Sequence, residues 1–180
     1  MDLDNAVVIL PTQSGSHPYE ALAVGKRTIY LLDRTGLGHI CTCCTTKNTQ
    51  IVQELASVVP GTGTPVYGNG KLYFTSKSKV EMYPLNQGML DSPTLSTWVR
   101  AEGIQLSARM GAMMEFSGIL GGGVLFALDA KTLSLLYRSD QAANRRDTVP
   151  PLAHFATPMV ADGKVFIGTQ NSLVVYGLLP

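Results

Sequence analysis

The residues best suited to chemistry lie in one short stretch, HICTCC, which runs from His39 to Cys44 and holds all three cysteines of the chain. Thiolates and imidazoles are the usual ligands of zinc. However, Cys43 and Cys44 are adjacent, so their side chains diverge in an extended chain, and no second ligand pair stands at zinc spacing. We therefore expect no metal site. A solvated loop with free thiols is the favoured interpretation, and a vicinal disulfide between Cys43 and Cys44 is the alternative.

Other catalytic patterns are weak. A lone histidine beside a proline, such as His17 in SHPYE, is more often a hydrogen-bonded loop residue than a base. The chain has no GxSxG motif. Gly121 to Gly123 lack the lysine and the helix of a phosphate loop, so they indicate a turn or a bulge. Arg145 and Arg146, in the charged stretch NRRD, are the best candidates for contact with an anion, and this loop can equally be solvated.

The composition excludes several classes of partner. The 180-residue chain has a net charge of +1 and a pI near 7.7, so nothing indicates binding to nucleic acid or to an anionic membrane. Hydrophobic residues make up 45 % and charged residues 15 %, which is typical of a folded chain with much apolar sheet surface. The most apolar stretch, Gly118 to Leu128, is too short and too rich in glycine to span a bilayer. The start MDLDNAVVILP does not resemble a signal peptide, so we expect either a cytoplasmic protein or a piece of a longer chain.

The elements that must position these residues are repeated along the chain. Thr64 to Leu85 reads TPVYGNGKLYFTSKSKVEMYPL, and Thr157 to Leu178 reads TPMVADGKVFIGTQNSLVVYGL, which aligns without a gap at an offset of 93 (157 − 64). The phrases LFALDAKT, from Leu125, and IYLLDRTG, from Ile29, stand at related places. Equivalent positions recur every 45 to 51 residues if they are marked by Asp33, Pro84, Asp129 and Gly177. Such a period is typical of propeller blades or of another stacked array.

Each unit is expected to consist of short strands and tight turns. In the last unit, Met159 and Val160 begin a strand, Asp162-Gly163 forms a hairpin turn, and Lys164 to Thr169 is the next strand. A third strand is predicted from Leu173 to Leu178, after which the unit stops. These strands indicate an all-β fold.

The other units show related signals. Asn69-Gly70 repeats the hairpin turn in the second unit, and LSLLYRSD, from Leu133, is predicted to be an outer fourth strand of the third unit. The stretch from Gln50 to Val59 is the one candidate for a short helical turn.

The phrases VLFALDAKTLSLLY, from Val124, and ADGKVFIGTQNSLVVYGL, from Ala161, resemble the blades of pyrroloquinoline quinone (PQQ)-like β-propeller repeat proteins. A blade of that family reads approximately "dGkvYvGs.dg.lyAlDa.tG..lW". The resemblance is strong in the last unit, good in the second and third, and limited to TIYLLDRTGLG in the first. It implies one propeller domain with about four blades of four antiparallel strands. The approximate units are 1–48, 49–94, 95–140 and 141–180.

Members of this family usually have seven or eight blades, so the chain resembles the C-terminal half of such a protein. One arrangement is a small closed ring of four blades, with the strand VVILP, from Val7 to Pro11, completing the last blade. The other is a homodimer whose two chains complete an eight-bladed ring, which would remove the exposed edge. We favour the dimer, because blades shaped for a large ring do not easily close at four. The family is mostly exported, which implies an extracytoplasmic location.

The resemblance extends to quinoprotein dehydrogenases, in which a vicinal disulfide lies against PQQ, a tryptophan stacks under it and oxygen ligands bind calcium. Those roles would fall here to Cys43, Cys44 and Trp98, with Arg146 as an anion contact in the channel. The outer-strand tryptophans of those enzymes are missing, and Tyr137 stands at one such position. The calcium ligands and the base would come from residues such as Glu54, Glu102, Glu115, Asn144 or Asp147.

Blade resemblance alone does not establish an activity, because one fold hosts many functions. We therefore predict a non-catalytic scaffold or binding module that presents the loops between its blades to a protein or carbohydrate partner. The alternative is a PQQ- and calcium-dependent oxidoreductase that acts on alcohols or sugars. A third hypothesis, a hydrolase with its site in the propeller funnel, has no motif to support it.

Overall fold

The protein is all-β, as predicted, and its regular elements are strands and three short 3₁₀ turns in the part of the chain that can be described. The computed structural model describes residues 7–25, 28–37, 50–56, 64–76, 79–96, 104–106, 112–115, 123–153 and 157–177. Among these residues, no helix has the length and apolar character needed to cross a membrane. The strands form four antiparallel sheets that follow one another in chain order.

The first sheet has the order β1-β2-β3-β4 and corrects two expectations. The N-terminal strand pairs with its neighbour in this sheet, Val8 opposite Leu22, and does not complete the last sheet. Within the stretch that was a candidate for a helical turn, Ile51–Ala56 is a strand, because pairing with the sheet satisfies its backbone groups while Val52 and Leu55 pack on the core. It belongs to the first sheet, although its residues fall in the second sequence unit. The elements are β1 (Val8–Ile9), β2 (Glu20–Val24), β3 (Thr28–Asp33), η1 (Arg34–Gly36) and β4 (Ile51–Ala56).

The second and third sheets each have a four-strand meander. In the second sheet, β9 also pairs with β7. In the third sheet, β13 is the outer strand that the sequence predicted, and it pairs with β12. The second sheet contains β5 (Val66–Gly68), β6 (Lys71–Ser76), β7 (Lys79–Asn86), β8 (Met89–Leu90) and β9 (Thr94–Leu95). The third contains β10 (Ile104–Leu106), β11 (Ala112–Glu115), β12 (Val124–Leu128) and β13 (Leu135–Arg138).

The last sheet has three strands in the order β14-β15-β16, as predicted from the sequence. A loop with two 3₁₀ turns leads into it from the third sheet. The elements are η2 (Ser139–Gln141), η3 (Ala143–Arg145), β14 (Met159–Ala161), β15 (Lys164–Gly168) and β16 (Leu173–Tyr176).

The sequence repeat is also a repeat of strand register. In the second sheet, Tyr73 lies opposite Val66 and Met82. In the last sheet, 93 residues later, Phe166 lies opposite Met159 and Val175. The same pairing therefore recurs in both sheets, so the echo in the sequence marks one structural unit used twice.

The two predicted hairpin turns are confirmed. Asn69 and Gly70 have φ values of 50° and 72°, and Asp162 and Gly163 have φ values of 48° and 67°. Two successive residues with positive φ are the requirement of a type I′ turn, which asparagine or aspartate followed by glycine meets at low cost. These turns fix the register of each hairpin.

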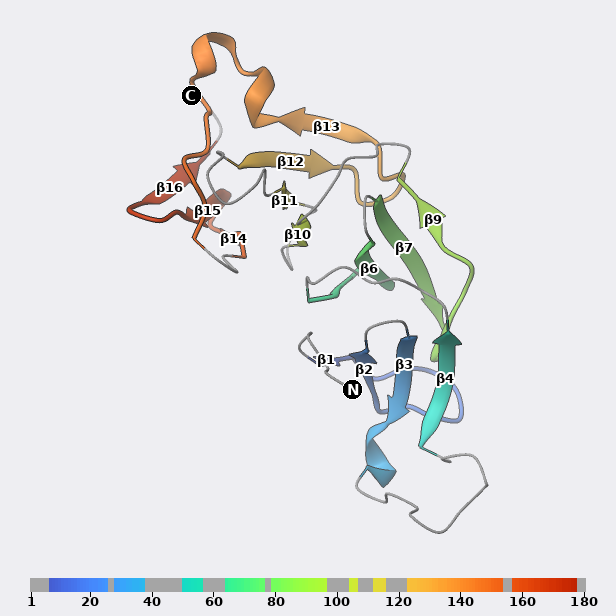
Figure 1. Ribbon diagram of the computed structural model, residues 1–180. Helices are drawn as coiled ribbons and strands as arrows, with labels where there is room; N and C mark the ends of the chain where they lie inside the picture. Colours follow the sequence, from blue (N-terminus) through green and yellow to red (C-terminus); the bar gives the residue numbers. More distant parts are fainter. Residues whose placement is uncertain are drawn as a thin grey trace.

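The sheets pack on one another through three apolar clusters. One cluster joins the first and second sheets, the next joins the second and third, and the last joins the third and fourth. Figure 1 shows the resulting arc, with β4, β9 and β13 on its convex side. None of the three clusters unites the first sheet with the last, so the described residues form an open array rather than a closed ring.

Candidate functional site

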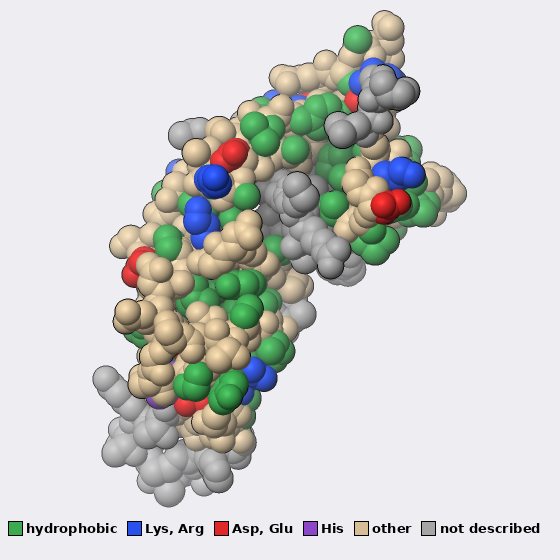
Figure 2. All heavy atoms as spheres, turned by 180° about the vertical axis from the view of Figure 1, so that it is seen from behind, with side chains coloured by type: hydrophobic (Ala, Val, Ile, Leu, Met, Phe, Trp, Pro, Cys, Tyr) green, Lys and Arg blue, Asp and Glu red, His purple; other side chains and the backbone are tan. Residues whose placement is uncertain are grey.

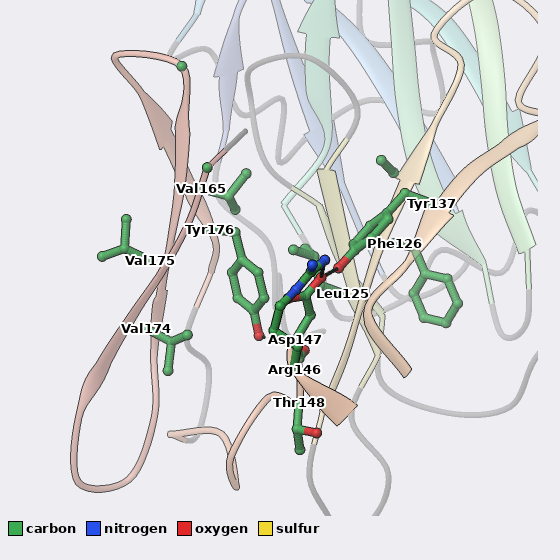
Figure 3. Close-up of a pocket in the computed structure, with 13 residues that line it drawn as sticks. Leu125, Phe126, Tyr137, Arg146, Asp147, Thr148, Val165, Val174, Val175 and Tyr176 are labelled. Atoms are coloured by element: carbon green, nitrogen blue, oxygen red, sulfur yellow. Dashed lines mark hydrogen bonds and ion pairs between the residues drawn. The ribbon is translucent and has the colours of Figure 1, made fainter. Parts of the chain in front are cut away.

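A groove of about 720 Å³ lies between the third sheet and the last sheet. Its walls are largely aliphatic and aromatic, with Leu125 and Tyr137 on one side and Val165, Val174 and Tyr176 on the other (Figure 3). Ligand sites are typically concave and mostly apolar, with a few polar groups that fix the orientation of the ligand. This groove has that composition.

Three polar side chains form one end of the groove. The Arg146 guanidinium donates two hydrogen bonds to the Asp147 carboxylate, Nε to Oδ1 at 2.8 Å and Nη2 to Oδ2 at 3.1 Å. The Tyr137 hydroxyl donates to Asp147 Oδ2 at 2.5 Å. Asp147 therefore holds both neighbours in fixed positions, and the remaining guanidinium N–H groups and hydroxyl lone pairs are left for a ligand.

The electrostatics of this end follow from the same contacts. The bonds from Arg146 and then from Tyr137 lower the pKa of Asp147 to about 2, so the carboxylate is ionised at neutral pH. The pairing raises the pKa of Arg146. Burial, with a further contribution from Asp147, raises the pKa of Tyr176 to about 12. The site thus presents a closed ion pair and neutral hydroxyls, which suits a polar uncharged ligand better than a free anion.

The loop between the third and last sheets positions the charged pair. Asn144 and Arg145 both have positive φ, at 57° and 53°, and this double left-handed conformation reverses the chain. The Thr148 hydroxyl then donates to the Arg145 carbonyl at 2.6 Å, and the Tyr176 hydroxyl donates to the Asp147 carbonyl at 3.1 Å. The loop is consequently tied to the last sheet, and Asp147 is held at the groove.

Asp147, named from the sequence as a candidate calcium ligand or base, lines this groove, and so does Arg146, the one of the four named cofactor contacts that the structure describes. The guanidinium of Arg146 is paired with Asp147, and its role as the contact for an anion stays a prediction. Cys43, Cys44 and Trp98 lie outside the described residues, so the proposed cofactor contacts stay predictions.

The described candidates for calcium and base chemistry lie on several different elements. Glu54 lies on β4 and Glu115 on β11, whereas Asn144 and Asp147 lie in the loop before the last sheet. Glu102 lies outside the described residues. Within the described ranges, no three His, Cys, Asp or Glu side chains are close enough together to hold a metal ion.

Sequence reasoning missed the tyrosine contribution to the groove. Tyr137 was noted only as a substitute for an outer-strand tryptophan, and Tyr176 only as a repeated strand residue. A signal was present, since Tyr176 shares its face of β16 with Val174, opposite the buried Ile167 on β15. The contact between Asp147 and the two tyrosines depends on the loop conformation and had no such signal.

A second polar cluster lies at the end of the first sheet. His17 Nδ1 lies 2.8 Å from Asp33 Oδ2, which confirms the interpretation of this histidine as a hydrogen-bonded loop residue. The bond from His17 and those from Thr35 lower the pKa of Asp33 to about 2. The nearby Glu20 side chain is completely buried, and burial raises its pKa to about 7.

Glu20 faces the second sheet, since it lies on the same face of β2 as Leu22 and Val24. A Cβ atom added at Gly88 would lie 2.8 Å from its Oε1 atom, so the Gln87-Gly88 turn closes over the carboxyl group. Neither carboxylate oxygen has a hydrogen-bond partner among the described residues. We therefore interpret Glu20 as part of the contact between the first and second sheets.

The comparisons with known proteins leave the family open. No protein-family model matches this chain, and no curated protein matches it.

Proposed function

We propose that this protein is a non-catalytic binding module of β-propeller type that binds carbohydrate in the groove between its third and last sheets. The observation that carries the proposal is the groove itself, in which tyrosine and aliphatic walls end at the fixed Arg146–Asp147 pair. The pair is carried by a loop between sheets, which is the part of a rigid repeat scaffold that usually binds partners.

Carbohydrate suits this arrangement because a sugar ring has an apolar C–H face and a polar edge of hydroxyl groups. The walls formed by Tyr137, Tyr176 and Val165 offer apolar surface to the face. The carboxylate of Asp147 accepts hydrogen bonds, and the guanidinium of Arg146 donates them, so together they complement hydroxyls that do both. A neutral ligand also leaves the ion pair intact.

The proposal includes the PQQ-like propeller family and its ring architecture. Two observations support it: the second and last sheets have the same strand register, and the four sheets stack in an arc. In this proposal each sheet is one blade, two chains complete an eight-bladed ring, and the protein works outside the cytoplasm, as the family resemblance implies.

Glycan-array screening followed by calorimetry with the best oligosaccharide tests the function. We expect Arg146→Ala and Asp147→Asn to weaken binding by about tenfold or more, since each removes a charge-assisted hydrogen bond. Arg34→Ala is the matched control, because Arg34 lies over the Tyr19 ring, in the region of the first sheet. Absence of glycan binding, or equal losses in the control, would overturn the proposal.

A further inference from the structure

The last sheet has one face that packs on the third sheet and one that does not pack on any described residue of the three core clusters. Val160, Val165, Ile167 and Tyr176 contribute to the cluster shared with the third sheet. The opposite face consists of Met159, Phe166, Leu173 and Val175, which we call the tail face. In Figure 3, the Val175 side chain lies on the other side of the sheet from Val165, although Val175 also borders the groove.

The equivalent face of the second sheet is buried. Subtracting the offset of 93 converts the tail face into Val66, Tyr73, Val80 and Met82, all of which pack against the third sheet. Val80 is 2 % exposed and Met82 is 4 % exposed, whereas their counterparts Leu173 and Val175 are 64 % and 47 % exposed. The same register thus gives the same kind of apolar face in both sheets, but no described residue of a core cluster covers this face in the last sheet. Figure 2 shows exposed hydrophobic side chains on the arm that carries the last sheet.

The residues that cover the second sheet identify what would cover the tail face. They come from β12 of the third sheet, where Val124, Phe126 and Leu128 point to the second sheet. The corresponding strand of the first sheet is β3, because LFALD from Leu125 matches IYLLD from Ile29. The counterparts are therefore Thr28, Tyr30 and Leu32.

These counterparts lie on the face of the first sheet that points away from the second sheet. Tyr30 pairs with Ala23 and Leu32 with Ala21, while the intervening Ile29 and Leu31 are buried in the core. Ile9, on β1, lies opposite Ala21 on this same outer face and is exposed, as is Val7. We call Val7, Ile9, Tyr30 and Leu32 the head face.

We propose that the tail face of one chain binds the head face of a second copy, in the way that the second sheet packs on the third, and that two such contacts close a ring of eight sheets. This inference rests on the proposed propeller architecture and names the surfaces and the direction of assembly. A head-to-tail contact that closes after two copies satisfies both faces of both chains. The first sheet of the same chain does not cover the tail face, since Figure 1 shows an open arc.

The chemistry of the two faces agrees with this contact. At the junction between the second and third sheets, the Tyr73 hydroxyl donates to the Ala130 carbonyl at 2.7 Å. Its counterpart on the tail face is Phe166, which has no hydroxyl to satisfy. A head-to-tail contact therefore buries apolar surface on the tail side without leaving a buried donor unpaired. Apolar patches of this kind mark interaction surfaces.

Analytical ultracentrifugation of the whole chain and of variants tests the proposal. We expect the wild-type protein to have a sedimentation mass of a dimer, twice the 19.3 kDa of one chain. Leu173→Asp blocks the tail face and Ile9→Asp blocks the head face, and each should give a monomer that remains folded because both side chains are exposed. Leu136→Asp, at an equally exposed leucine on β13, is the matched control and should stay dimeric.

Mixing the two monomeric variants tests the direction of the contact. Leu173→Asp retains a head face and Ile9→Asp retains a tail face, so a head-to-tail contact predicts a heterodimer with one intact junction. No heterodimer at high concentration, a monomeric wild-type protein, or a dimer that survives Leu173→Asp would each overturn the proposal. Glycan binding is measured separately on the Leu173→Asp monomer, so loss of the assembly and loss of the proposed ligand site are distinguished.

Discussion

The second sheet and the last sheet are the same structural unit in two environments. Their hairpin turns, their registers and the residues that face the preceding sheet correspond at a constant offset, with Leu72, Phe74 and Tyr83 replaced by Val165, Ile167 and Tyr176. Their opposite faces differ, because a third sheet covers one and no described residue of a core cluster covers the other. Burial is thus set by the neighbour and not by the unit.

This comparison separates local from non-local causes of structure. A turn such as Asn69-Gly70 or Asp162-Gly163 is fixed by its own backbone and should behave alike in both sheets. A side chain such as Met82 or Val175 gains its stabilising effect only from what packs on it. Substitutions at matched positions should therefore divide into pairs with equal effects and pairs with unequal effects.

The largest expected difference lies on the two opposite faces. Met82→Ala should lower the free energy of unfolding by about 2–5 kcal/mol, because it opens a cavity in a packed core. Val175→Ala, measured in the Leu173→Asp background to keep the protein monomeric, should change it by less than about 1 kcal/mol. Urea denaturation followed by circular dichroism gives both values. Equal losses would show that the tail face is already packed within one chain.

The second sheet, unlike the described part of the last sheet, should make the stability of the protein depend on pH. The Gln87-Gly88 turn of the second sheet closes over Glu20, and no such turn is seen among the described residues of the last sheet. Burial raises the pKa of the Glu20 carboxyl group from 4.5 to about 7. The folded state therefore holds its proton between these values while the unfolded state releases it, so stability falls as the pH rises from about 4.5 to about 7 and stays low above that range.

Replacing Glu20 by Gln removes this titration. At pH 8 the Glu20→Gln protein should be more stable than the wild type by up to roughly 3 kcal/mol, from 1.36 kcal/mol per pKa unit. Thermal unfolding between pH 4 and pH 8 measures the effect. Asp162→Asn, at an exposed turn residue, is the control and should leave the slope unchanged. Parallel pH profiles for Glu20→Gln and the wild type would contradict this account of the buried carboxyl group.

The turn glycines should give equal and smaller effects. Gly70 and Gly163 both have positive φ, and a Cβ atom added at either meets nothing within 4 Å. Gly70→Ala and Gly163→Ala should therefore each cost about 1–2 kcal/mol, from backbone strain alone. Chemical denaturation of the two variants checks this. A difference of more than about 1 kcal/mol would mean that the surrounding sheet, rather than the turn, sets the cost.

The smallest effect is expected at a matched pair of hydroxyl groups. The Tyr83 hydroxyl donates to Glu81 Oε2 at 2.8 Å, and the Tyr176 hydroxyl donates to the Asp147 carbonyl at 3.1 Å. Each change to Phe should cost about 1 kcal/mol or less in stability, since one hydrogen bond is lost. Glycan binding should fall only in Tyr176→Phe, because this tyrosine lines the groove. Equal loss of binding in Tyr83→Phe would remove the groove as the ligand site.

Much of the fold could be predicted from the sequence, because its signals are local. Positive-φ turn residues and alternating apolar positions specify the hairpins of the last sheet. The stretch that contains β4 was a candidate for a helical turn because its apolar residues fit either period, and only pairing with β3 decides between them. The placement of β1 beside β2 likewise depends on a contact across a loop.

The candidate site was less accessible from the sequence. Arg146 was identified from its charge alone, but its pairing with Asp147 requires two residues with positive φ, Asn144 and Arg145, neither of which is a glycine. The burial of Glu20 could have been found, since strand alternation places it on the face of Leu22 and Val24. However, the sequence does not show that a turn of the second sheet packs on this position, and a glutamate in a strand is usually assigned to the solvent-facing side.

Oxidation of individual methionines tests the central claim most directly, because it measures the exposure of side chains on the intact protein. Met159 lies on the tail face, Met82 is buried between the second and third sheets, and Met89 is an exposed control on β8. With hydrogen peroxide and peptide mass spectrometry, we expect Met159 of the wild-type protein to be protected like Met82, and to become as reactive as Met89 in Leu173→Asp. Oxidation of Met159 as fast as Met89 in the wild type would contradict a covered tail face.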